Sequence, residues 1–321
     1  MAYGQNGHLG IAFQDSYGTA ETGSYHWFPL ISESLVETVP EIVESGMRNR
    51  MEEGESLDGF HEIAGDIVVP AHPLLIGKFF KAWCDVDSYD KTLGTSEYTH
   101  VFMPSPNDWG DLAAVPPMTV EVYRDAGSAH QYEDCLLNTL TLEIAHGTVI
   151  KQTASVIGGG FSKVAKNTAS YTTGSEWMWN QASIQIGGSA VDELSTITIT
   201  FNNNLEAKGT LDGKKYANRI KRGDYRTIEV AGTAIFKDDT EFDLYRNQTR
   251  QEYIVTVEGQ ACASGYNTAL EIVLPSVFYT TFPVNIGGPG LLEVGFTGKA
   301  KYNSGSGTIG RFTLVNTLAT Y

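Results

Sequence analysis

The sequence is short of cysteine and of long apolar runs. Its three cysteines, Cys84, Cys135 and Cys262, are odd in number and have no CxxC spacing, so we expect buried reduced thiols rather than a disulfide framework or a zinc site. No stretch approaches the roughly 20 apolar residues that a membrane-spanning helix needs. The opening letters MAYGQNGHLGIAF lack a basic segment followed by an apolar one. We therefore expect no signal peptide, no membrane association and synthesis in a cytoplasm.

Positive charge is also scarce. The chain has 22 lysines and arginines against 38 aspartates and glutamates, and its formal net charge is −16. Such a chain does not attract nucleic acid or an anionic membrane. The balance still permits a surface past which DNA slides without sticking. With 41% hydrophobic residues among 321, the chain can build one large β domain or two ordinary ones.

Catalytic signatures are missing. The chain has no G-x-S-x-G, H-E-x-x-H, Walker or G-x-G-x-x-G motif, and no two histidines are four residues apart. The acidic run at 85–90 starts like a calcium loop, but Asp90 stands where an EF-hand needs Gly and Ser96 where it needs Glu. The letters KDDTEFD at 237–243 and RGD at 222–224 are typical of solvated turns. We expect no enzyme activity, no cofactor and no metal.

Period-two alternation is what the sequence has in abundance. In NTLTLEI, the apolar residues Leu140, Leu142 and Ile144 face one side of a strand, and STITITF at 195–201 repeats the pattern. Five further stretches are predicted to be half-buried strands: TIEVAG (227–232), EFDLY (241–245), QEYIVTVEG (251–259), ALEIVL (269–274) and GLLEVGF (290–296). Gly, Asn and Asp turns separate them. The pattern predicts a mainly β sandwich or barrel.

One helix and several irregular segments complete this prediction. Residues 72–83 place Pro73 in a first turn and apolar side chains four residues apart, which predicts a short helix flanking a sheet. Residues 85–117 are rich in turn formers and are expected to be a long loop. The first 25 residues are expected to be a mobile arm.

An internal echo suggests a duplication with a period near 170 residues. EIAGDIVV (62–69) resembles EVAGTAIF (229–236). Three further matches follow in the same order: Ile31–Leu35 with Phe201–Leu205, 138–144 with 267–272, and 156–160 with 285–290. We therefore predict an arm at 1–25 and two tube-like β domains at 26–175 and 176–321. The alternative is one elaborated domain over 26–321.

Residues 31–69 are unusually acidic, with ten carboxylates and two arginines. Within them, the loop 36–62 interleaves its charges with apolar residues, while Pro40 and Gly46 interrupt any helix. A free solvated loop does not need those apolar residues, whereas a loop docked on a neighbouring subunit does. The docking candidates are Glu37, Val39, Ile42, Val43, Met47, Arg48, Arg50 and Met51.

Several segments of the chain resemble the tail tube proteins, or major tail proteins, of long-tailed bacteriophages. The resemblance rests on GIAFQDSYGTAETG, FPLISESL, the acidic loop with Arg50 and Gly54, IAGDIVVPAHPLLIGKFF, LNTLTLEIAHGTVIKQTASVIGGG, STITITFNNNLEA and YRTIEVAGTAIFKDDTEFDLY. It implies a β-sandwich or barrel with a flanking helix and a long loop. It also implies a structural virion protein whose subunits close into six-fold rings around a channel.

In that family the rings stack and DNA passes through the channel, so the expected location is the tail of a virion, made in the host cytoplasm. The implied partners are further copies of the chain and other tail proteins (tape measure, baseplate and terminator), with DNA only in transit. If the chain holds two domains, three chains make a ring with pseudo-six-fold symmetry, and we favour this over a hexamer. An acidic channel wall would repel DNA evenly.

Two other functions remain open at this stage. A carbohydrate-binding or glycan-cleaving β-sandwich could use Trp177 and Trp179, which SEWMW would place on one side of a strand. A capsid decoration protein or a baseplate ring would also lack catalysis and carry docking arms.

Overall fold

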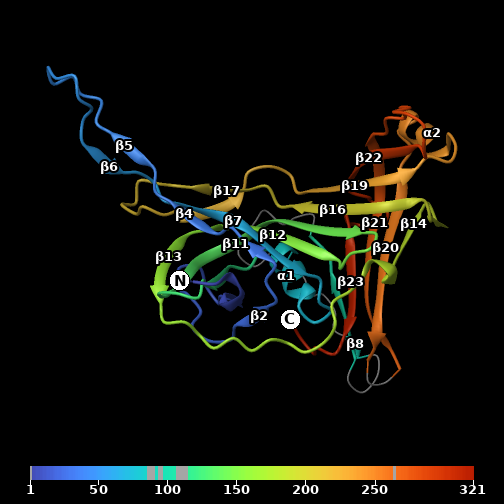
Figure 1. Ribbon diagram of the computed structural model, residues 1–321, viewed down its shortest axis with the longest axis horizontal. Helices are drawn as coiled ribbons and strands as arrows, with labels where there is room; N and C mark the ends of the chain where they lie inside the picture. Colours follow the sequence, from blue (N-terminus) through green and yellow to red (C-terminus); the bar gives the residue numbers. More distant parts are fainter. Residues whose placement is uncertain (1, 85–90, 93–96, 106–114, 263–264) are drawn as a thin grey trace.

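The computed structural model describes residues 2–84, 91–92, 97–105, 115–262 and 265–321 (Figure 1). It confirms a mainly β sandwich with short flanking helices and long loops. The acidic run at 85–90, considered above for calcium, lies outside the described residues.

The first half of the chain forms the following elements, in order: β1 (His8–Phe13), β2 (His26–Phe28), β3 (Ser32–Glu33), β4 (Val36–Thr38), β5 (Glu41–Val43), β6 (Ser56–Asp58), β7 (Glu62–Pro70), α1 (Ile76–Cys84), β8 (Lys91–Thr92), β9 (Tyr98–Phe102), β10 (Met118–Tyr123), β11 (Ala129–Ala145), β12 (Lys151–Gly158) and β13 (Gly160–Val164).

The second half forms these elements: β14 (Ala182–Ile186), β15 (Ser189–Ala190), β16 (Leu194–Asn202), β17 (Leu205–Lys208), β18 (Arg219–Arg222), β19 (Thr227–Ile235), α2 (Thr240–Arg246), β20 (Gln251–Ala261), β21 (Asn267–Thr281), β22 (Glu293–Ala300) and β23 (Arg311–Asn316). Single-turn 3-10 helices lie at Gly4–Asn6 and Trp179–Gln181.

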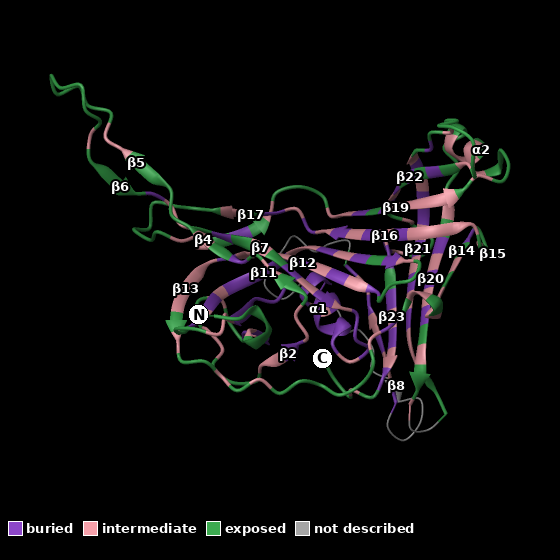
Figure 2. Ribbon diagram, in the orientation of Figure 1, coloured by how far each residue is buried: buried purple, intermediate pink, exposed green. Residues whose placement is uncertain are grey.

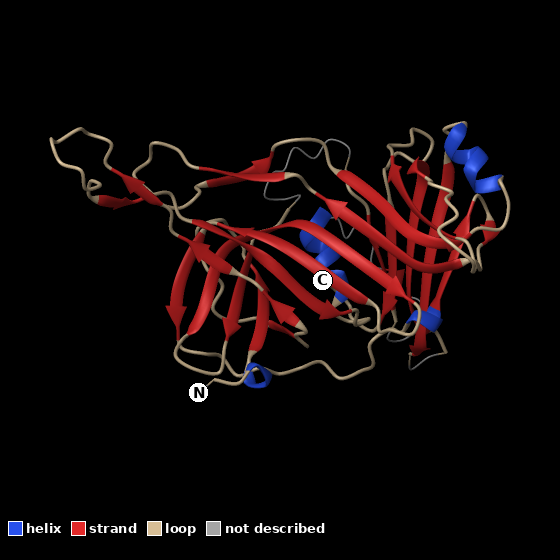
Figure 3. Ribbon diagram, turned by 45° about the horizontal axis from the view of Figure 1, so that its top comes forward, coloured by secondary structure: helices blue, strands red, loops and turns tan. Residues whose placement is uncertain are grey.

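One antiparallel sheet runs through both halves of the chain, and we call it the main sheet. Its strand order is β3/β4, β7, β12, β11, β16, β19, β22, β21. The halves join where β11 pairs with β16, with Leu142 opposite Ile199 and Ile144 opposite Ile197. The join is therefore a regular strand pair rather than a linker (Figure 3).

The same pairing scheme occurs twice. In the first half, β1 pairs with β10, β10 with β11, β11 with both β12 and β13, and β12 with β7. In the second half, β14 pairs with β20, β20 with β21, β21 with both β22 and β23, and β22 with β19. Each half also has a protruding hairpin, β5–β6 or β17–β18, and a helix after the strand that follows the hairpin.

Only one of the four sequence matches joins equivalent strands in the same register. Residues 62–69 lie in β7, and residues 229–236 lie in β19 except for the last, which directly follows it. These two strands hold the same place in the two pairing schemes. The other three are out of register. For example, 156–160 joins β12 to β13, whereas 285–290 lies before β22. Short alternating segments resemble one another too easily to fix a register.

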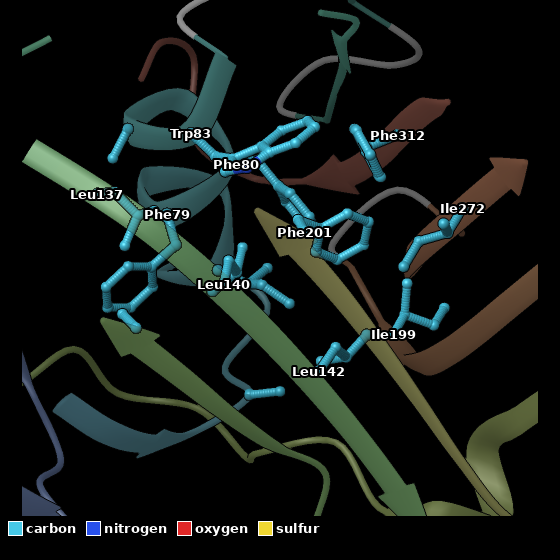
Figure 4. Packing of buried hydrophobic residues seen from close by; sticks show 14 of the residues in the cluster. Phe79, Phe80, Trp83, Leu137, Leu140, Leu142, Ile199, Phe201, Ile272 and Phe312 are labelled. Atoms are coloured by element: carbon cyan, nitrogen blue, oxygen red, sulfur yellow. The ribbon is translucent and has the colours of Figure 1, made fainter. Parts of the chain in front are cut away.

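The core lies between the main sheet and helix α1, and it is continuous across both halves (Figure 4). The expected inward faces are buried: Leu140, Leu142 and Ile144 of β11, and Ile197, Ile199 and Phe201 of β16. The α1 residue Phe80 stacks on Phe312 at 4.9 Å between ring centroids. Trp83 packs on Phe201 at 5.4 Å.

The predicted helix at 72–83 begins later, at Ile76, and lies almost wholly inside the sandwich. A second helix contradicts the predicted strand at 241–245, which is α2. Phe242 and Tyr245, three residues apart, pack on the core from one face of this helix, and Glu241 and Asp243 in its first turn favour its positive end. Five residues are too few to distinguish the period of two of a strand from the period of 3.6 of a helix.

Two expected irregular segments contain strands. Within the expected mobile arm, residues 8–13 form β1, which is buried and pairs with β10 from His8 opposite Tyr123 to Phe13 opposite Met118. Within the expected loop at 85–117, β9 pairs with β23. Glycine-rich and turn-rich composition was a poor guide here, because tertiary pairing supplies the hydrogen bonds that the local sequence does not predict.

Candidate assembly surfaces

The acidic loop forms a hairpin that projects from the body of the protein (Figure 2). We call residues 41–58 the acidic hairpin. Glu41 pairs with Asp58 and Val43 with Ser56, and the backbone N–H of Gly59 donates to Pro40 at 2.7 Å below them. It carries six carboxylates and two arginines. None of its residues is buried, so the core does not depend on it.

Most docking candidates lie on the acidic hairpin or just before it. Met47 and Met51 at its tip are fully exposed, and Val39 and Ile42 are about half exposed. The guanidinium of Arg48 pairs with Glu44 on the same hairpin. The remaining hairpin candidates, Val43 and Arg50, are half-buried and exposed respectively. These exposed apolar side chains have no obvious use in a single copy of the chain.

Glu37 has a different environment from the other candidates. It lies on β4, where its carboxylate bonds to His61 Nδ1 at 2.8 Å and accepts a hydrogen bond from the Tyr216 hydroxyl. Burial and this bond raise the pKa of Tyr216 to about 12. Burial opposes ionisation of Glu37, but the Tyr216 and His61 bonds outweigh it and lower the pKa of this carboxyl. The ionised Glu37 therefore ties the two halves together within one chain.

The second protruding hairpin has the opposite charge. We call residues 205–226 the basic hairpin, because they hold seven lysines and arginines against three carboxylates. It touches the base of the acidic hairpin: Lys215 Nζ lies 2.7 Å from Asp58, and the His61 N–H donates to the Lys215 carbonyl at 2.7 Å. The rings of His61 and Tyr216 meet at 5.0 Å. The acidic composition of the whole chain hides this basic segment, although a count of charges over 205–226 reveals it.

The face of the main sheet that points away from α1 is polar, and we call it the polar face. Neighbouring strands align hydroxyls across it, as where Thr141 and Thr200 lie 3.3 Å apart. Five exposed carboxylates and two half-buried lysines lie among these hydroxyls: Glu62, Asp66, Glu143, Glu229, Glu293, Lys151 and Lys299. Lys299 pairs with Glu229 at 2.8 Å. A small apolar cluster that includes Leu136 and Leu205 covers one end of this face.

The two tryptophans considered for sugar binding do not share a face. Trp177 is 1% exposed, and Trp179 begins a 3-10 helix and packs on the His146 ring at 4.1 Å. Residues 175–179 form no strand. The stacking platform expected from SEWMW is therefore not formed.

Other possible sites are structural. Arg222 of the RGD triplet donates to the Asn203 carbonyl at 2.7 Å, which fixes the start of the turn after β18. The part of the chain that the structure describes holds no group of three or more His, Cys, Asp or Glu side chains arranged for a metal. The thiols of Cys84 and Cys135 are buried, and that of Cys262 is half-buried. Across the described ranges, no helix has the length and apolarity to cross a membrane.

Comparison with known proteins gives one family match. A family model described as phage tail tube protein matches residues 4–300, which is nearly the whole chain. A search of curated proteins finds no match.

Proposed function

We propose an assembly for a chain that belongs to the phage tail tube protein family: copies of it close into rings, and the rings stack into a tube. The family gives the protein a structural role in the virion tail. The observation that supports ring closure is the main sheet, which passes from one half of the chain to the other through a regular strand pair. A sheet that continues in this way from chain to chain leaves no open edge once the ring closes.

We place the channel on the polar face. Among the described residues, this face carries no packed apolar layer beyond the cluster at one end, whereas the opposite face holds the core and α1. Its carboxylates outnumber its lysines by five to two. DNA carries one negative charge per ~1.7 Å of duplex axis, so a hydroxyl-rich wall with excess negative charge lets DNA pass without holding its phosphates.

The two hairpins supply the contacts between rings. The acidic hairpin presents carboxylates and exposed methionines, and the basic hairpin presents lysines and arginines. Opposite charges favour encounter and fix which surfaces meet, while the apolar tip buries area once docked. Val39, Ile42, Val43, Met47, Arg48, Arg50 and Met51 are the proposed docking residues, and Glu37 positions the base of the hairpin.

Three chains are sufficient for one ring if each half of the chain occupies one position. The repeated pairing scheme supports two tandem tube-like domains, with the boundary between β13 and β14. Residues 8–13 belong to the first domain because β1 corresponds to β14. The other partners we propose are the tape measure, baseplate and terminator proteins of the tail, with DNA only in transit.

Negative-stain microscopy of concentrated protein, with and without a tail initiator complex, tests this proposal. We expect hollow rings or tubes with one axial repeat. Compact particles that never polymerise under either condition would contradict it and would favour a decoration protein. Saturable binding on a glycan array would favour the carbohydrate-binding reading instead.

A further inference from the structure

The repeated pairing scheme leaves two ends of the main sheet unpaired. At one end, β4 pairs with β7 along one edge, with Glu37 opposite Ile63, and no described strand pairs with its other edge. At the other end, β21 pairs with β22 only as far as Thr281 opposite Thr297. The next residues, 282–286, form no strand among the residues described.

Inside the chain, the corresponding elements are joined. β16 holds the place of β4, because Ile199 lies opposite Val230 in β19 as Glu37 lies opposite Ile63 in β7. The edge of β16 that corresponds to the free edge of β4 pairs with residues 139–145 of β11. The β11–β16 pair therefore shows which strand partner each free end of the main sheet lacks.

The irregularity where β10 meets β11 fixes the residue correspondence. There, Met118 lies opposite Cys135 and Val120 opposite Tyr132. Strands β20 and β21 repeat this shift, with Gln251 opposite Val277 and Tyr253 opposite Leu274.

Cys135 then corresponds to Val277, and Leu140, Leu142 and Ile144 correspond to Phe282, Val284 and Ile286. The apolar alternation is the same, but the burial differs. Ile144 is 6% exposed against Ile197, whereas Ile286 is 87% exposed.

We infer that residues 281–286 of one chain form a strand along the free edge of β4 of the next chain, in the register of the β11–β16 pair. Resting on the ring proposed above, this contact places Asn285 opposite Val36 and Ile286 opposite Leu35. It buries Ile286 as Ile144 is buried. Pro283 cannot donate a backbone hydrogen bond, so the junction between chains has fewer bonds than the junction within one.

A disulfide trap tests the register. The paired variant is Val36→Cys with Asn285→Cys, in a chain whose half-buried native thiol is removed by Cys262→Ser. Directly opposed residues have Cβ atoms about 4.5–5.5 Å apart, close enough for a disulfide after small adjustment. Mild oxidation of assembled tubes should give a ladder on a non-reducing denaturing gel that ends at three chains. The matched control, Glu41→Cys with Asn285→Cys, places the first thiol on the exposed acidic hairpin and should give no ladder.

The outcomes separate this inference from the proposal on which it rests. If tubes form but the Val36→Cys and Asn285→Cys chain gives no ladder, the inferred strand register is wrong and the proposed tail tube still stands. A Cys262→Ser chain that forms no tubes counts against the tube itself. Ile286→Asp provides a second test in the native background, because an exposed charge leaves the monomer folded but cannot enter the junction. Rings that persist in Ile286→Asp would also overturn the inference.

Discussion

At the scale of single residues, two glycines explain the sequence echo. A Cβ added to Gly65 would lie 2.5 Å from the Ser34 carbonyl oxygen, and one added to Gly232 would lie 2.7 Å from the Thr196 oxygen. In each half, the strand before the hairpin approaches the strand after it too closely for a side chain. The shared Ala-Gly letters therefore reflect the same close approach, which is why this match was in register when the others were not.

His26 of β2 gives a pH dependence at the same scale. Burial, followed by Lys78 and Lys81, lowers the pKa of His26 from 6.5 to about 4. Between these pH values the unfolded chain binds a proton that the folded chain does not, so the free energy of unfolding falls as pH falls. Burial lowers the pKa of His72 and His130 as well, so they act in the same direction.

The native chain should lose free energy of unfolding between pH 7 and pH 4.5, and we expect His26→Gln to make this loss smaller by roughly 1 kcal/mol. A pKa shift corresponds to about 1.36 kcal/mol per pKa unit, but solvent screening of a partly exposed imidazole reduces this value. Urea denaturation at the two pH values measures this loss. His146→Gln, at an exposed position, is the matched control for the substitution itself. Equal losses in His26→Gln and the native chain would show that His26 does not contribute.

At the scale of elements, the long strands and the projecting acidic hairpin follow from the sequence. The alternation of β11 and β16 is unambiguous over seven residues, and Pro40 and Gly46 exclude a helix. The sequence did not predict β1, β9 or α2. The strands depend on partners more than a hundred residues away, and α2 is too short for its period to appear. The basic hairpin does not follow from the net charge, because the acidic residues elsewhere in the chain outnumber its lysines and arginines.

The acidic hairpin should be dispensable for folding and necessary for stacking. Replacing residues 41–58 by Asn-Gly keeps the Glu37, His61 and Tyr216 contacts. It removes no buried residue and only exposed ion pairs, so we expect less than about 1 kcal/mol of lost stability. Thermal melting and sedimentation velocity measure the two properties together.

A more conservative variant separates the hairpin's apolar tip from its charge. Met47→Gln with Met51→Gln keeps the hairpin and its carboxylates, and we expect it to weaken stacking without changing the melting temperature. A deletion that unfolds the subunit would show that the hairpin belongs to the core.

At the scale of the whole molecule, the net charge of −16 is unevenly placed. Positive charge is concentrated on the basic hairpin, and negative charge on the acidic hairpin and the polar face. Within one chain, the hairpins already meet through Lys215 and Asp58. The proposed tube needs this distribution, with one face that repels DNA and hairpins that attract further copies of the chain. The acidic composition predicts that the chain repels DNA, but only the fold shows which surface carries the positive and which the negative charge.

A cryo-microscopy map of the assembled tube at side-chain resolution tests this arrangement most directly. We expect three chains around each ring, with Thr141, Thr200, Glu143 and Glu229 pointing into the bore and α1 on the outer side of the sheet. Six chains to a ring, a bore that faces the α1 side, or a bore lined by lysine and arginine would contradict it.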